Sequence, residues 1–258
     1  MPAAVAFLFV AVSVVAGADA RVEVRPSDPP DPTLRRHNGI ISDMEIRHHH
    51  WFFDLDGTLA RTGEDIVVAW KGALAALGRD LTNFDRVFRI GPTLESIVYA
   101  LYDDATPQLV EDLMARFRPL YDESGFPNTV PYPGVPELLA ALKASGAKAY
   151  IVTNKRDHAT RLLAAKFGWD RALDGIWSYD TFGSAYKKPD LLAKLLKDLG
   201  VDPQDAVMVG DTKGDVDAGK ANGTATIGVT WGYGSPEEVS AADAVFSSAA
   251  EIAKNLAK

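Results

Sequence analysis

The sequence predicts an α/β fold, a doubly wound parallel sheet with an all-helical insertion. Short apolar runs without alternation recur along the chain, which is typical of strands covered on both faces. Amphipathic helical segments separate these runs, and repeated strand–helix–strand units indicate a doubly wound sheet. After the first apolar run, a stretch with helical periodicity and no clear strand interrupts the alternation.

Six apolar runs are the predicted strands, at residues 51–53, 149–152, 175–177, 206–209, 225–229 and 244–246. Pro136 can open a helix that Gly146 closes, and Pro189 can open one that ends at Gly200. Asp157 is the predicted N-cap of the helix that follows the second strand. These signals place helices between the strands.

The interruption spans residues 61–131 and carries two apolar helical faces. The first face consists of Ile66, Trp70, Ala73, Leu74 and Leu77, and the second of Leu109, Leu113, Phe117 and Leu120. Pro119 should kink or end the second helix. We therefore expect a helical insertion at 61–131, an α/β core at 44–60 and 132–258, and an N-terminal extension at 1–43.

The N-terminal extension begins with an apolar run within residues 1–20, and residues 21–43 have the composition of a disordered linker. Ala18-Asp19-Ala20 has the form of a signal-peptide cleavage site, but no positive side chain precedes Arg21. The run is short for a membrane span. We expect a cytoplasmic protein without a membrane anchor, with export as the alternative.

Composition narrows the function classes. The net charge of −8 argues against a nucleic-acid partner, although local positive charge still permits a phosphorylated small molecule. The chain has no cysteine, which excludes disulfides, zinc thiolates and cysteine nucleophiles.

Two carboxylates follow the first predicted strand. Asp54 and Asp56 are separated by one residue, so in extended backbone they project to the same side. Gly57 lets the backbone turn sharply and approach a ligand. An aspartate can attack a phosphoryl group, and a second acid can protonate the leaving oxygen. A capped strand-to-loop turn is the alternative for this pair alone.

A second acidic pair follows the strand at 206–209. Asp211 and Asp215 are four residues apart across a predicted helix start, where both can face one site. Mg²⁺ takes oxygen ligands, commonly one or two carboxylates with phosphate and water. An N-capping aspartate is the alternative. We interpret His48–His50 as incidental, because adjacent residues of a strand alternate faces.

Further polar residues lie at the same predicted edge. Thr153 and Asn154 end the second strand, and Lys188 precedes a helix, where its point charge suits a phosphoryl oxygen. A solvated surface lysine is the alternative for Lys188. Ligands of open α/β sheets bind beyond the carboxyl ends of strands. Asp54, Thr153 and Asp211 all occupy such ends.

In chain order the motifs are FDLDGTL at 53–59, IVTNK at 151–155, KKPD at 187–190 and VGDTKGD at 209–215. This sequence closely resembles the haloacid dehalogenase superfamily, from residue 51 to about 247, with the insertion as its cap. Ile90-Gly91-Pro92, Tyr132-Pro133-Gly134-Val135 and Gly232-Tyr233-Gly234 resemble the phosphoglycolate-phosphatase-like subgroup. Arg61-Thr62-Gly63 departs from the Asp-Ser of many relatives.

The resemblance implies that Asp54 is a nucleophile and Asp56 a general acid/base. It further implies that Mg²⁺ is held by Asp54, the carbonyl of Asp56, and Asp211, with Asp215 helping directly or through water.

For substrate binding, the resemblance implies that Thr153 and Lys188 bind phosphoryl oxygens, and we place Asn154 beside them. Arg89, next to Ile90, is the candidate for binding a substrate carboxylate, and a solvated arginine is the alternative. The expected activity is phosphate removal from a small phosphorylated metabolite, most simply 2-phosphoglycolate, by a monomer or homodimer.

Other activities stay open at this point. A 5′-nucleotidase, a broad sugar-phosphate phosphatase and a β-phosphoglucomutase-like enzyme would share both aspartates. A dehalogenase is disfavoured because it needs neither Asp56 nor a metal. A non-catalytic binding module on the same fold is the alternative from another class.

Overall fold

The computed structural model describes residues 48–183 and 185–256. The apolar segment within 1–20 and the linker at 21–43, on which the expectations about export rest, lie outside the described residues. Among the helices of the described part of the chain, none has the length and apolar character needed to cross a membrane.

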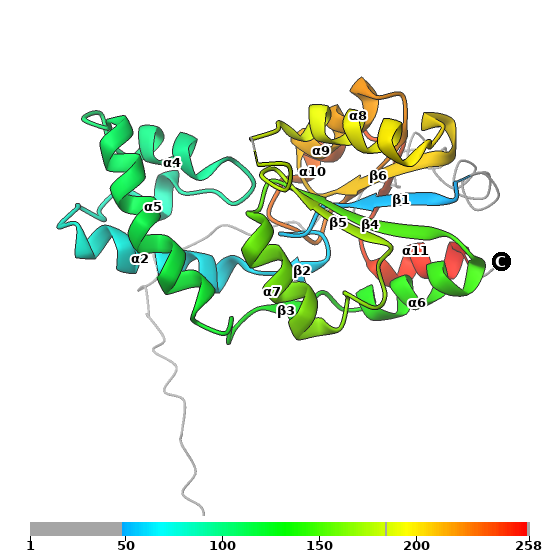
Figure 1. Ribbon diagram of the computed structural model, residues 1–258, viewed down its shortest axis with the longest axis horizontal. Helices are drawn as coiled ribbons and strands as arrows, with labels where there is room; N and C mark the ends of the chain where they lie inside the picture. The colour runs from blue at the N-terminus through cyan, green and yellow to red at the C-terminus, as the bar shows by residue number, and fades with distance from the viewer. Residues whose placement is uncertain (1–47, 184, 257–258) are drawn as a thin grey trace, which may run out of the picture. The chain divides into compact units, whose positions relative to one another are not determined.

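Six parallel strands form the central sheet, and the predicted fold class is confirmed (Figure 1). The strands are β1 (His50–Phe53), β4 (Lys148–Thr153), β5 (Gly175–Ser178), β6 (Ala206–Gly210), β7 (Ala225–Val229) and β8 (Ala244–Phe246). Their order is β5-β4-β1-β6-β7-β8, and all neighbours pair in parallel. The chain passes from β1 to β4 and β5 and then returns to the other side of β1 with β6. Strand order therefore reverses at β1, where ligands of such sheets bind.

Helices cover both faces of this sheet (Figure 1). One face carries α8 (Lys188–Leu199), α9 (Lys213–Ala221) and α10 (Pro236–Val239), and the other carries α6 (Val135–Ser145), α7 (Asp157–Phe167) and α11 (Ala249–Leu256). A single 3₁₀ turn, Pro203–Asp205, precedes β6. Alternate strand residues explain the two layers: Phe52 packs with the α8 side, whereas Trp51 and Phe53 pack with the α6 side.

The helix boundaries follow the predicted punctuation with one correction. Pro136 and Pro189 lie in the first turns of α6 and α8, and Gly146 is a left-handed C-cap. Asp157, however, is not the N-cap of α7: Arg156 is, and Asp157 is the first helical residue. The N–H of Asp157 donates to a carboxylate oxygen of Asp180 at 2.8 Å. A residue distant in sequence thus caps this helix, so a local pattern could not identify it.

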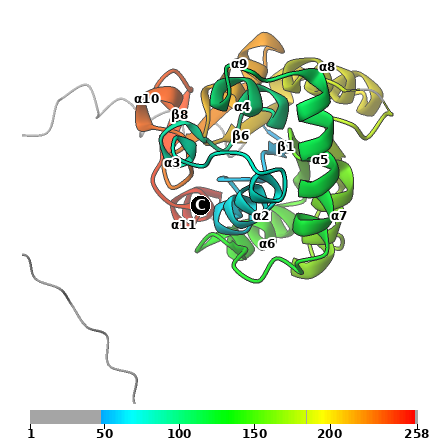
Figure 2. The ribbon, with the colours of Figure 1, turned by 90° about the vertical axis from the view of Figure 1, so that its left-hand side faces the viewer.

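The helical insertion lies between two short strands. Its elements are β2 (Ala60–Arg61), α2 (Gly63–Ala76), α3 (Phe84–Val87), α4 (Leu94–Leu101), α5 (Pro107–Asp122) and β3 (Val130–Pro131). β2 and β3 pair antiparallel, so the two connections to the core form a small ribbon. Figure 2 shows α5 beside α7 of the core, and these two helices are in contact.

Aromatic packing holds α2 against α5. Trp70 of α2 is fully buried, and its ring lies 5.7 Å from that of Phe117 in α5. The predicted face of α5 is wrong at Leu120, which is 47% exposed, because the buried positions 113, 117 and 121 follow a spacing of four. Pro119 lies inside α5, which continues to Asp122. Proline has no N–H to bond to the carbonyl of Ala115, so α5 lacks this one hydrogen bond, and the helix ends three residues later.

A buried carboxylate of α2 fixes the second connection to the core. Asp65 accepts hydrogen bonds from the backbone (3.1 Å) and side-chain (2.9 Å) amides of Asn128 and from the hydroxyl of Thr129 (2.6 Å).

Asp65→Ala should lower the free energy of unfolding by about 3 kcal/mol, because it leaves these buried donors without an acceptor. Urea denaturation measures the loss. Asp85→Ala, at an exposed ion pair with Lys71, should change stability by less than about 1 kcal/mol. Equal losses in both variants would contradict the structural role of Asp65.

Candidate active site

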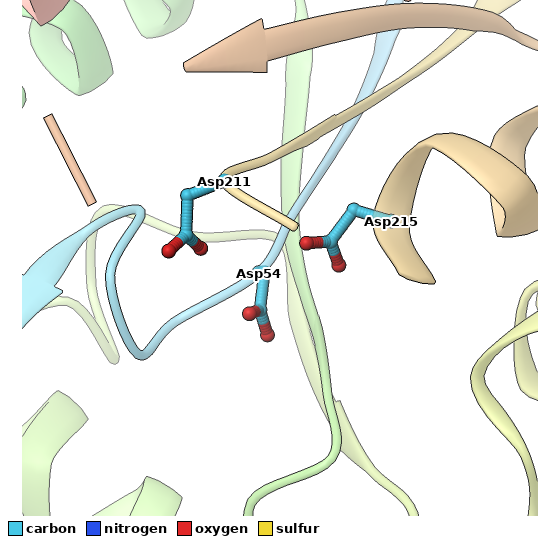
Figure 3. Close-up of side chains that lie close together, drawn as sticks. All are labelled: Asp54, Asp211 and Asp215. Atoms are coloured by element: carbon cyan, nitrogen blue, oxygen red, sulfur yellow. The ribbon is translucent and has the colours of Figure 1, made fainter. Parts of the chain in front are cut away.

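Three buried carboxylates meet at the carboxyl edge of the sheet, where strand order reverses (Figure 3). Asp54 directly follows β1, Asp211 directly follows β6, and Asp215 lies in the first turn of α9. Each offers an oxygen within 4.8 Å of the others. β1 and β6 pair in register, so their ends bring residues more than 150 positions apart to one place.

Asp54 is held between a strand and a lysine. Its backbone N–H donates to the carbonyl of Val209 at 3.0 Å, which continues the β1–β6 pairing past the strand end. Its Oδ1 lies 2.9 Å from Nζ of Lys188, the first residue of α8. The same ammonium lies 2.5 Å from Oδ1 of Asp215. Lys188 thus joins two of the three carboxylates, and its side chain is only 5% exposed.

Asp211 is oriented by donors that the sequence did not indicate. Its carboxylate accepts hydrogen bonds from the hydroxyl of Thr58 (3.0 Å) and from the backbone N–H groups of Tyr233 (2.7 Å) and Gly234 (3.3 Å). Thr58 belongs to the FDLDGTL motif, and the other two belong to the late glycine-rich segment. Both segments are therefore structural supports of this side chain.

Asp215 is fixed by the start of its own helix. Oδ2 accepts from the backbone N–H (3.0 Å) and the hydroxyl (2.7 Å) of Thr212, which completes a capping box. Oδ1 is left to face Lys188. The N-cap of α9 is thus Thr212 and not an aspartate, and Asp215 is the N3 residue of the capping box. This contact leaves its other oxygen available to the cluster.

Glycine at position 57 makes room for Asp211. Gly57 has φ +89°, a conformation that L side chains rarely adopt, and a Cβ there would lie 2.2 Å from Oδ2 of Asp211. Gly232 approaches the same oxygen, since a Cβ there would lie 2.3 Å from it. The two glycines allow backbone to enclose the carboxylate closely.

The charges in this cluster do not balance. Three carboxylates face one ammonium, so the fully ionised cluster carries two uncompensated negative charges. Burial raises the pKa of Asp54 to about 7; the Lys188 ammonium opposes the rise, and the neighbouring carboxylates add to it. Burial, together with the charge of Asp215, raises the pKa of Asp211 to about 6. A hard divalent cation would supply the missing charge, so these residues fit Mg²⁺.

Asp56 lies beside this cluster and has its own partner. Nζ of Lys155 is 3.0 Å and 3.1 Å from the two carboxylate oxygens of Asp56. Lys155 ends the IVTNK motif, but no role for it was predicted from the sequence. Its place one residue beyond Asn154, at the same sheet edge as Asp56, is the signal that could have indicated the pair.

The predicted substrate-binding residues are placed unequally. Thr153 is buried at the end of β4, and its Oγ1 accepts from the backbone N–H of Lys155 at 3.2 Å. Nδ2 of Asn154 lies 3.5 Å from the carbonyl of Gly91, so the loop of the insertion reaches this edge. Arg89 is exposed, and its guanidinium donates to the carbonyl of Phe88 at 2.7 Å. The structure therefore brings Thr153 and Asn154 to the edge but gives Arg89 a local partner.

Among the described residues, the Asp54–Asp211–Asp215 cluster is the group of acidic or histidine side chains that could hold a metal ion. His50 begins β1 at the end opposite Asp54, and its ring stacks on Tyr150. His49 lies 2.9 Å from a carboxylate oxygen of Asp205. These contacts are those of structural histidines.

Comparison with known proteins gives consistent matches. The model of the family described as Haloacid dehalogenase-like hydrolase matches residues 51–229. Phosphoglycolate phosphatase of Aquifex aeolicus is 35% identical over 182 residues, 70% of this chain and 84% of that protein. A 5′-nucleotidase of Pseudomonas aeruginosa is 34% identical over 205 residues, 78% of this chain and 91% of that protein. The crystal structure of a predicted phosphatase from Clostridium acetobutylicum matches with a TM-score of 0.72 and 26% identity, over 82% of this chain and 99% of that one.

Proposed function

We propose that this chain, which belongs to the haloacid dehalogenase-like hydrolase family and is a phosphatase, hydrolyses 2-phosphoglycolate. The reaction would pass through a covalent phosphate on Asp54, with Mg²⁺ as cofactor. One observation carries the proposal: the buried carboxylate of Asp54 lies beside a buried ammonium and two further carboxylates at the sheet edge. Phosphoryl transfer depends mainly on such positioning and charge neutralisation.

In the first step, a carboxylate oxygen of Asp54 attacks phosphorus and the bond to the leaving oxygen breaks. Asp56 gives its proton to that oxygen, so the product leaves as an alcohol. The ammonium of Lys188, 2.9 Å from Asp54, and the hydroxyl of Thr153, which is buried at the end of β4, would bind the phosphoryl oxygens.

In the second step, Asp56 takes a proton from water, and the oxygen of that water attacks the phosphorus of the aspartyl phosphate. The bond between phosphorus and Asp54 breaks, which regenerates both carboxyl groups and releases phosphate. Asp54, Asp211, Asp215 and the carbonyl of Asp56 would hold Mg²⁺, which supplies positive charge opposite the phosphoryl oxygens.

The position of the helical insertion supports a small substrate, because its loop leaves little room at the sheet edge. Its loop at Gly91 approaches the edge so closely that a Cβ there would lie 3.3 Å from Cγ2 of Thr212.

The relative named phosphoglycolate phosphatase supports 2-phosphoglycolate as the substrate. The relative named 5′-nucleotidase, of which a larger share is covered, supports nucleoside 5′-monophosphates as the second candidate. Comparing kcat/KM for both substrates decides between them, and no turnover of 2-phosphoglycolate would overturn the first.

Arg89→Ala tests whether the guanidinium of Arg89 binds the carboxylate of 2-phosphoglycolate. If the guanidinium leaves the carbonyl of Phe88 and binds that carboxylate, the variant should lose roughly 10- to 100-fold in kcat/KM for 2-phosphoglycolate. Activity on p-nitrophenyl phosphate, which has no carboxylate, should be nearly unchanged. Arg86→Ala is the control, since Arg86 bonds to Asn83 in the same segment. Equal losses on both substrates, or none, would remove the specificity role from Arg89.

A further inference from the structure

Asp56, the general acid/base of the steps above, forms a largely buried ion pair with Lys155, which has no role in those steps. The side chains of Lys155 and Asp56 are 6% and 15% exposed, and Nζ contacts both carboxylate oxygens, at 3.0 Å and 3.1 Å. Two contacts from one ammonium oppose rotation of the carboxylate about its side-chain torsions. Such a buried pair costs desolvation energy, so stability alone does not explain it.

The same ammonium also contacts the helical insertion. Nζ of Lys155 lies 4.5 Å from the centroid of the Tyr121 ring, within the range of a cation–π contact. Tyr121 is 2% exposed and lies in the last turn of α5. The next residues pair as well, since the guanidinium of Arg156 forms a salt bridge with Asp122. Two consecutive residues of α5 therefore hold two consecutive residues of the loop after β4.

We propose that Lys155 is the positioning residue of the general acid/base. It aims the carboxyl group of Asp56 at the leaving oxygen, which takes its proton, and then at the attacking water, which returns one. Tyr121 of α5 sets the place of the Lys155 ammonium. The inference rests on the proposed function, because it assumes the role of Asp56. Proton transfer requires a distance of about 3 Å between the heavy atoms, and a misplacement of about 1 Å can cost on the order of 10²-fold in rate. The contact with Tyr121 links this alignment to the insertion.

Lys155→Met tests the positioning role, because methionine keeps an unbranched side chain, one atom shorter, without the charge. We expect kcat for 2-phosphoglycolate to fall on the order of 10²-fold while KM stays within about twofold. With p-nitrophenyl phosphate, whose leaving group barely needs a proton, the first step should survive and the second should be slow. The expected signature is a burst of nitrophenolate close to one per enzyme, with a covalent phosphate accumulating. Lys155→Arg should restore most of the rate.

The insertion is tested at Tyr121. Tyr121→Phe keeps the ring and should have near wild-type kcat, whereas Tyr121→Leu removes it and should lose roughly 5- to 30-fold. The control is Lys166→Met: this lysine of α7 bonds to the carbonyl groups of Gly125 and Phe126 in the connection after α5 and does not contact Asp56. It should keep wild-type kcat and show no burst. Thermal unfolding of each variant identifies loss through misfolding.

Three results would overturn the role of Lys155. One is wild-type kcat in Lys155→Met. Another is a raised KM with unchanged kcat, which would make Lys155 a substrate contact. The third is an equal loss in Lys155→Met and Lys166→Met without a burst, which would make the pair structural. Retained turnover in Asp54→Asn would instead overturn the proposed function, and this role with it, so the two failures are distinguishable.

Discussion

Asp54→Asn is expected to abolish turnover of every phosphate monoester, with a loss on the order of 10⁴-fold or more. Asparagine preserves the size of the side chain and one acceptor oxygen, but its neutral amide cannot attack phosphorus. It also removes the negative charge that lies 2.9 Å from Lys188. The loss should be the same for 2-phosphoglycolate and for p-nitrophenyl phosphate, because both need the nucleophile.

Steady-state phosphate release measures this loss. The matched control is Asp217→Asn, since Asp217 lies in α9 near the cluster but is exposed and paired with Lys213. It should retain wild-type kcat. Selective loss on one substrate in Asp54→Asn would show that the residue chooses substrates and does not form the covalent bond.

Asp211→Asn is expected to weaken Mg²⁺ binding by a factor on the order of 10² or more, because it removes one of three clustered carboxylates. Thr58 and Tyr233 donate to different oxygens of Asp211. The amide oxygen of asparagine can still accept from the N–H of Tyr233, and its NH₂ group can donate to the hydroxyl of Thr58, so the fold should persist. The activity of the variant should require a much higher Mg²⁺ concentration, or be lost.

Mg²⁺ binding can also be measured without turnover. A ligand that binds the native state raises the melting temperature. In the wild type, Mg²⁺ should raise the melting temperature, and in Asp211→Asn the rise should nearly vanish at the same concentration. Asp217→Asn should respond as the wild type does. An unchanged Mg²⁺ response in Asp211→Asn would remove Asp211 from the metal site.

The sheet could be predicted because its strands are buried on both faces. Runs such as 206–209 are continuously apolar, and such a run can be recognised in the sequence without knowing which strands lie beside it. β2 and β3 were not predicted, since a strand of two residues has no period to detect. The prediction for Leu120 is wrong because a helix face can continue three or four residues after Phe117. The sequence favours the apolar Leu120, whereas the structure buries Tyr121.

The candidate site was predictable where residue type and strand end coincide. Asp54 and Asp211 follow apolar runs, and parallel strands align their carboxyl ends, so their proximity follows from the fold. The pairing of Lys155 with Asp56 joins residues 99 positions apart and was not predicted. The contact with Tyr121 depends on how the insertion packs on the core, which no local pattern records.

A phosphate trapped on Asp54 is the most direct test of the covalent mechanism. Asp56→Asn should still react with p-nitrophenyl phosphate, because nitrophenolate barely needs protonation, but should hydrolyse the intermediate slowly. General acid–base help is worth on the order of 10²–10⁴-fold, so the intermediate should accumulate. Intact mass spectrometry after a rapid acid quench should find one added phosphate on Asp56→Asn, which peptide mapping should place on Asp54, and none on Asp54→Asn. Wild-type turnover in Asp54→Asn, or a phosphate on another residue, would contradict the mechanism.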